Sequence, residues 1–156
     1  MVFGNDGKLW IAVGESGQPE LSQLMGITHG KLIRLNDDGT TPDDNPYTEK
    51  NGYEAYHCGT DDLEGMVPKD ASEDAVCSEI WASGLRNPFR MSLDPNEKEK
   101  TRLIISDVGA KTWEEINYGG TDYPMANYGY EEYEGPCKRY VNSGVGTTHA
   151  YRNLLT

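Results

Sequence analysis

The sequence predicts an all-β protein made of short strands. Only 36% of its 156 residues are hydrophobic, and 18 glycines and 8 prolines interrupt the chain at frequent intervals. This composition is typical of many short strands joined by turns rather than of long amphipathic helices. One short helical turn is expected, at 19–25.

Two stretches of the chain, 2–17 and 91–109, share one pattern that predicts how the strands are arranged. Each contains a short strand, a turn rich in Asn, Asp, Gly or Pro, and a more apolar strand that ends in an acid, one further residue and a glycine. The turn at 5–7, Asn-Asp-Gly, is a strong hairpin signal, because these residues tolerate positive φ. Another short strand is expected after each stretch, at 31–36 and 115–118.

A repeated unit of about four short strands is typical of a blade of a β-propeller. The chain holds about two such units, and a third begins near Tyr128. Because a propeller closes with about four to eight blades, we expect 1–156 to be one incomplete propeller domain, a fragment of a larger whole. Such a piece would expose apolar blade faces if it were made alone.

An acidic segment, 37–78, is expected as an inserted loop within the first blade. Between Asp37 and Glu79 there are 13 acidic residues against two basic ones, Lys50 and Lys69. A charge run of this kind is typical of a solvated surface, and cation binding is the alternative. The formal net charge of -12 argues against a nucleic-acid partner, since a polyanion would be repelled.

The three cysteines suggest a disulfide. Cys58 and Cys77 bracket a stretch that contains Gly, Asp and Pro, so a bridge between them would close a loop and contribute about 3 kcal/mol. Cys137 would then need a partner outside this chain. Three free thiols of a cytosolic protein are the alternative, and none of the cysteines has the spacing of metal ligands.

The sequence contains no apolar run long enough to span a membrane, and no signal peptide is visible. Both ends of the chain look truncated, so the missing signal says little about localisation.

Four motifs occur in order over most of residues 1–137. They are GKLIRLN with DNP (30–36 and 44–46), GLRNP (84–88), DVG with EEI (107–109 and 114–116), and NYGY with EG (127–130 and 134–135). Together they resemble the glucose/sorbosone dehydrogenase family, whose members depend on pyrroloquinoline quinone (PQQ). The resemblance implies a six-bladed propeller that carries PQQ and calcium, oxidises a sugar or polyol by hydride transfer to the quinone, and is secreted or periplasmic.

The resemblance also implies a cofactor contact in the GLRNP motif. The guanidinium fork of Arg86 suits a carboxylate or quinone oxygen of PQQ, and Asn87 beside it offers both a donor and an acceptor. Alternatively, Arg86 hydrogen-bonds neighbouring carbonyls and locks the blades together.

Calcium positions follow from the same resemblance. The carbonyls of Gly109 and Ala110 match the place where the family holds the cofactor's calcium, a hard cation that takes oxygen ligands. Glu115 and the carbonyl of Tyr128 match a second, structural calcium site. For Glu115, an ordinary position on a surface strand is the alternative.

The catalytic base is not expected within this chain. In the family it is a histidine shortly before the strand that starts here at Val2, which places it upstream of Met1. Glu15 stands where the family has an aspartate beside that base, and its longer side chain leaves open whether it orients the base or is a plain strand-end carboxylate. The histidines present do not match the position of the base: His29, His57 and His149. The fragment alone should therefore be inactive.

Two other functions are compatible with the same residues. Hedgehog-interacting-protein-like relatives use this scaffold without catalysis, to bind a protein or a carbohydrate outside the cell. The cysteine-bracketed segment 58–77 and the EGPC sequence at 134–137 favour that alternative. A structural β-domain without any ligand is the third interpretation.

Overall fold

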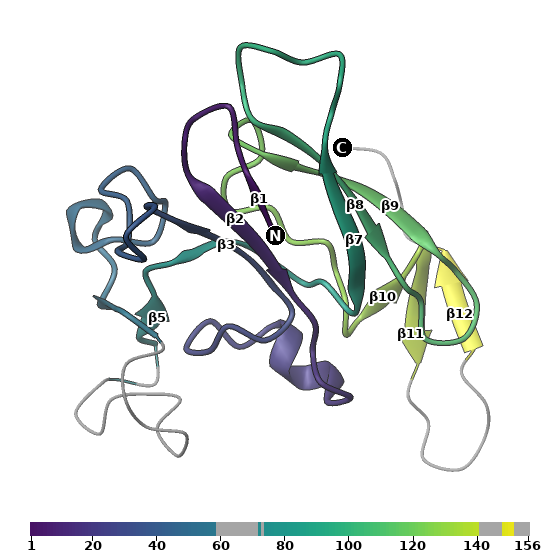
Figure 1. Ribbon diagram of the computed structural model, residues 1–156. Helices are drawn as coiled ribbons and strands as arrows, with labels where there is room; N and C mark the ends of the chain where they lie inside the picture. Colours follow the sequence, from purple (N-terminus) through teal and green to yellow (C-terminus); the bar gives the residue numbers. More distant parts are fainter. Residues whose placement is uncertain (59–71, 73, 141–147, 152–156) are drawn as a thin grey trace.

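The regular structure of the chain is almost entirely β-sheet (Figure 1). The computed structural model describes residues 1–156 except 59–71, 73, 141–147 and 152–156. The strands among the described residues are β1 Val2–Phe3, β2 Leu9–Val13, β3 Lys31–Leu35, β4 Ala55–Tyr56, β5 Val76–Cys77, β6 Ile80–Ser83, β7 Pro88–Leu93, β8 Arg102–Asp107, β9 Glu115–Gly120, β10 Tyr133–Glu134, β11 Cys137–Tyr140 and β12 Thr148–Tyr151.

Helical structure in the described part of the chain is limited to two short 3₁₀ turns, η1 Pro19–Ser22 and η2 Glu49–Asn51. The first lies within the stretch for which the sequence predicted a helical turn. None of the helical segments described is long and apolar enough to cross a membrane.

The first sheet has the antiparallel order β1-β2-β3-β6. The predicted hairpin is confirmed: Val2 pairs with Trp10, and the turn closes at Gly7, whose φ of 72° suits a residue without a side chain. The strand β3 follows β2 as expected. The strand β6 completes the sheet only after the acidic segment, so that segment is inserted between the third and fourth strands of one blade-like sheet.

The second stretch forms an antiparallel sheet of the order β7-β8-β9. Leu93, Leu103 and Gly119 stand opposite one another across it. A third sheet, β10-β11-β12, follows, as the predicted third unit required. The predicted all-β fold, in about two blades and part of a third, is therefore confirmed.

One hydrophobic core joins the first two sheets. Trp10 and Trp81 meet edge to face with ring centroids 5.1 Å apart, and Leu32 of β3 packs with Leu103 and Ile105 of β8. The burial of β8 alternates strictly, so its buried face also carries an acid, Asp107, at the end of the strand. This alternation places a carboxylate at the edge of an otherwise apolar core.

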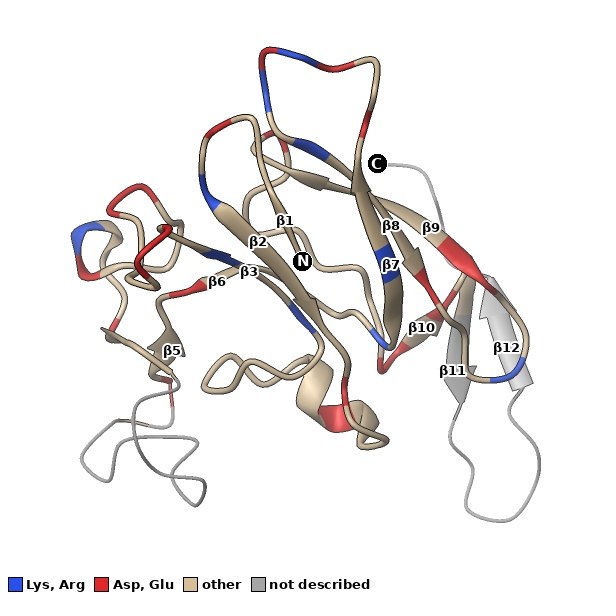
Figure 2. Ribbon diagram, viewed as in Figure 1, with Lys and Arg blue, Asp and Glu red and all other residues tan. Residues whose placement is uncertain are grey.

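The acidic segment is anchored to the first sheet by the DNP motif. Asn45 is fully buried, and its side-chain amide donates to the carbonyls of Arg34 and Ser78, each at 3.0 Å. Asp44 accepts from the Arg34 guanidinium at 2.7 Å, and Asp6 accepts at 2.9 Å. Among the described residues of the segment, the acidic positions lie on its loops and turns, outside the strands of the first sheet (Figure 2).

A disulfide joins Cys58 to Cys77, as the sequence predicted, with Cα atoms 5.3 Å apart. It lies beside the parallel pair β4-β5 and a small second cluster that includes Tyr47 and Ile80. Cys137 is a buried free thiol, and the prediction that its partner lies outside this chain stays a prediction.

Candidate functional site

The GLRNP motif makes the turn between β6 and β7 and thereby places Arg86. Gly84 has φ 78°, and a Cβ there would lie 2.3 Å from Asn127 Oδ1, so only glycine fits. Leu85 is fully buried in the core and anchors the turn to it. The next two residues, Arg86 and Asn87, therefore emerge at the end of the sheet.

The backbone of this turn is held by Asp107, at the end of β8. The amide of Arg86 donates to Asp107 Oδ2 at 2.9 Å, and the amide of Asn87 donates to Oδ1 at 2.6 Å. Burial raises the pKa of Asp107 to about 6, and the two amide bonds oppose that shift. Asn87 itself has an exposed side chain.

The guanidinium of Arg86 lies at the centre of the candidate site. Its Nη1 donates to the carbonyls of Val108 and Gly109, each at 2.8 Å. Its Nε donates to the hydroxyl of Tyr130 at 3.3 Å and lies 3.8 Å from Glu15 Oε1. These carbonyl contacts are the ones expected of a blade-locking residue, and 26% of the side chain is still exposed for a ligand.

The loop 108–114 presents the carbonyls that were assigned to calcium. The loop is shaped by Glu134, only 3% exposed, whose Oε1 accepts from the amides of Lys111, Thr112 and Trp113 at 2.8–3.2 Å. Any side chain at Gly109 would collide with the carbonyl of Trp113. The loop can therefore adopt this conformation only with glycine at 109, and Glu134 holds the loop in place.

The structure brings most of the proposed site residues together. A small pocket in the described part of the chain is lined by Arg86, Asp107, Val108, Gly109, Glu115, Tyr130 and Glu134. Glu15 adjoins it through Arg86, and Ala110 follows Gly109 in the loop. Tyr128 lies apart from this lining: it packs against the core, and its amide bonds the carbonyl of Ser83 at 2.9 Å.

The donor set of this pocket fits the groups that the family resemblance implies. Three carboxylates and one guanidinium line the pocket, which leaves excess negative charge beside carbonyl oxygens, and such hard oxygen donors suit calcium. One carboxylate oxygen of Glu115 is already bonded to the amide of Gly135. A partly exposed guanidinium suits a cofactor carboxylate.

His29 and His57 are not among the residues that line this pocket. That none of the three histidines is the catalytic base stays a prediction. The carbonyl of His29 accepts from buried Lys31, His57 contacts Glu79 next to the disulfide, and His149 falls in β12.

Comparison with known proteins identifies the family. A family model described as glucose/sorbosone dehydrogenase matches residues 1–73. The aldose sugar dehydrogenase YliI of Escherichia coli is 32% identical over 133 residues, which make up 83% of this chain. The chain belongs to the glucose/sorbosone dehydrogenase family.

Other relatives of the family extend the match. The HIPL1 protein of Arabidopsis thaliana is 30% identical over 164 residues, 99% of this chain. The PQQ-bound aldose sugar dehydrogenase of Streptomyces coelicolor superposes on 85% of the chain with a TM-score of 0.59 and 29% identity. The chain spans 29%, 21% and 29% of these three relatives, respectively, and is therefore a partial propeller.

Four residues of the site were not assigned a role from the sequence: Asp107, Val108, Tyr130 and Glu134. Each lies within one of the recognised motifs. The motifs therefore identified its position in the chain, but they did not predict its contacts. The signal that could have identified Asp107 is its place on the buried face of an alternating strand, where an acid needs partners.

Proposed function

We propose that the intact protein oxidises a hydroxyl group of a sugar or polyol, with PQQ and calcium bound at the pocket around Arg86. The observation that carries this proposal is the convergence of Arg86, the carbonyls of Val108 and Gly109 and three carboxylates on one pocket at the end of two sheets. PQQ would supply the two-electron acceptor and calcium the polarising charge.

The chain's own residues would bind and orient in this reaction. Arg86 and Asn87 would hold oxygens of the cofactor, while Gly109 and Ala110 would offer carbonyls to calcium. The family resemblance also pairs Glu115 with the Tyr128 carbonyl in a second, structural calcium site, although Glu115 lines the Arg86 pocket and Tyr128 lies apart from it. Glu15 would orient a base contributed by a part of the protein beyond this chain, through its place beside Arg86 at 3.8 Å.

The test is reconstitution of the intact protein with PQQ and calcium. We expect dye reduction with at least one member of a panel of aldoses and polyols, and a shift of the quinone absorbance on binding. No dye reduction together with no absorbance shift would contradict the proposal.

A second candidate function is recognition of a protein or carbohydrate outside the cell. It is favoured by the disulfide, which is typical of secreted proteins, and by the match of 99% of the chain to HIPL1. Binding of PQQ without turnover of any substrate would favour this candidate.

Calcium alone distinguishes both candidates from a structural domain without a ligand. A ligand that binds only the native state raises its stability, by about 2.7 kcal/mol at 100 times the dissociation constant. An unchanged melting temperature throughout a calcium titration would favour the purely structural interpretation.

A further inference from the structure

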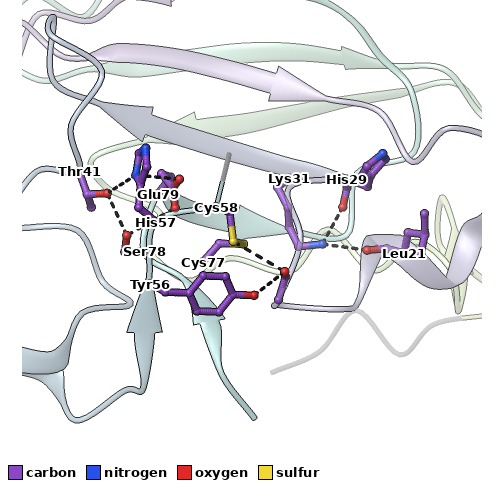
Figure 3. Close-up of a disulfide and its surroundings, with 11 residues drawn as sticks. Leu21, His29, Lys31, Thr41, Tyr56, His57, Cys58, Cys77, Ser78 and Glu79 are labelled. Atoms are coloured by element: carbon purple, nitrogen blue, oxygen red, sulfur yellow. Dashed lines mark hydrogen bonds and ion pairs between the residues drawn. A yellow bond between two sulfur atoms is a disulfide. The ribbon is translucent and has the colours of Figure 1, made fainter. Parts of the chain in front are cut away.

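A second group of chemically reactive side chains surrounds the disulfide, apart from the Arg86 pocket (Figure 3). Cys58 and Cys77 have their sulfur atoms within 4.8 Å of a carboxylate oxygen of Glu79. His57 precedes Cys58 in the chain, and its Nδ1 lies 2.9 Å from Glu79 Oε1. Two sulfurs and a carboxylate oxygen therefore meet at one place, and an imidazole nitrogen adjoins the carboxylate.

The carboxylate of Glu79 is unusual in its environment. The residue is 2% exposed, and its Oε1 has no hydrogen-bond partner among the described residues. The close contact with His57 Nδ1 thus lacks the geometry of a hydrogen bond. A buried carboxylate oxygen without a donor is costly, and an imidazole nitrogen this close to it makes the pair suited to sharing a cation.

We propose that reduction of the disulfide converts this place into a binding site for a zinc-type divalent cation with four ligands, His57, Cys58, Cys77 and Glu79. Zinc prefers four such ligands in a tetrahedron, at about 2.3 Å from sulfur and about 2.0–2.2 Å from nitrogen or oxygen. Two thiolates on one ion would then lie about 3.7 Å apart, so the sulfurs need only separate after the S–S bond breaks.

The chemistry of the switch balances with a dithiol as the reductant. The dithiol gives two electrons and two protons to the S–S bond, which becomes two thiols, and is itself oxidised to a disulfide. Binding of the cation then releases the two thiol protons to solvent. The oxidised protein has no thiolate at this place, so oxidation and cation binding exclude each other.

The spacing along the chain explains why the sequence does not reveal the site. His57 and Cys58 follow β4, whereas Cys77 and Glu79 lie at the end of β5 and before β6. The parallel pairing of Tyr56 with Cys77 brings the two halves together. The ligands thus come from two segments that no short metal-binding motif connects.

Cobalt(II) is the probe for the test, because thiolate ligands give it charge-transfer absorption that zinc lacks. The intact protein would carry Cys137→Ala, so that only the two cysteines of the site contribute. After reduction by a dithiol and its removal, we expect one cobalt ion per chain with thiolate charge-transfer bands, displaced by zinc. The oxidised protein should show no such bands.

Variants of the two non-sulfur ligands test whether His57 and Glu79 take part in binding the metal. We expect Glu79→Gln and His57→Gln to weaken cobalt binding about tenfold or more each, while Glu49→Gln, an exposed acid of the same segment, leaves it unchanged. Absence of thiolate bands in the reduced protein, folded or not, would overturn the proposal. If the His57 and Glu79 variants bound cobalt as tightly as the wild-type protein, the proposal would also be overturned, because the cysteines alone would then bind the metal.

Discussion

At the scale of the residue, Arg86 makes two kinds of contact that can be separated by experiment. Its fork bonds two carbonyls and the hydroxyl of Tyr130, and part of it is open to a ligand. A lysine keeps the charge but cannot keep the fork. With Arg86→Lys, we expect the PQQ concentration for half-maximal reconstitution to rise about tenfold or more, because a charged hydrogen bond contributes about 1.5–3 kcal/mol.

The control for this substitution is Arg90→Lys, on the exposed side of β7. A lower melting temperature with unchanged PQQ binding would assign Arg86 to locking the blades and not to the cofactor.

Lys31 is a fully buried lysine that should make the free energy of unfolding depend on pH. Its ammonium donates to the carbonyls of Leu21, Ser22 and His29 at 2.7–3.0 Å. Burial lowers the pKa of Lys31 from 10.5 to about 7. Between these values the unfolded chain holds a proton that the folded chain has lost, so the free energy of unfolding should rise with pH, by at most about 1.4 kcal/mol per pH unit.

The measurement is urea unfolding of the intact protein across this pH window. Lys31→Met should remove this rise, and the matched change of the exposed Lys50 should not. An identical pH profile for wild type and Lys31→Met would contradict the assignment.

At the scale of the element, the loop 108–114 depends on one carboxylate from a strand of the third sheet. Three amides of the loop converge on Glu134 Oε1. Glu134→Gln keeps an acceptor but removes its charge, so we expect the free energy of unfolding to fall by about 1.5–3 kcal/mol. Calcium binding should weaken as well, because the loop that presents the carbonyls loosens. Glu132→Gln, an exposed neighbour, is the control in both the unfolding and the calcium titration.

The elements themselves were largely predictable, because hairpins are encoded locally. The Asn-Asp-Gly turn at 5–7 and the apolar run at 103–105 that leads to an acid predict β1, β2 and β8 from residues that adjoin in the chain. The pairing of β3 with β6 across the acidic segment is different, because contacts between distant residues leave no periodic signal. Glu134 and Asp107 both lie in motifs that the sequence revealed. Their meeting with Arg86 in one pocket involves residues distant in the chain, so it appeared only in the structure.

At the scale of the whole molecule, the second sheet has an apolar face that the described part of the chain leaves exposed. On β9, Ile116 is 76% exposed and Tyr118 is 53% exposed, while their neighbours in the strand lie on the opposite face and are less exposed. The sequence predicted such exposed blade faces for a partial propeller. Since the relatives are more than three times as long as their match to this chain, we expect a further blade to cover this face in the intact protein.

Ile116 should therefore behave in the intact protein as a core residue, although it is exposed in this chain. Truncation of a buried isoleucine to alanine costs about 2–5 kcal/mol, whereas an exposed position changes by about 0.5 kcal/mol or less. Urea unfolding of the intact protein with Ile116→Ala should show the larger loss. Leu24→Ala, at an exposed apolar position after η1, should show the smaller one. A small effect at Ile116 would mean that no neighbouring blade packs on β9, and the propeller would then have to continue from another edge of the second sheet.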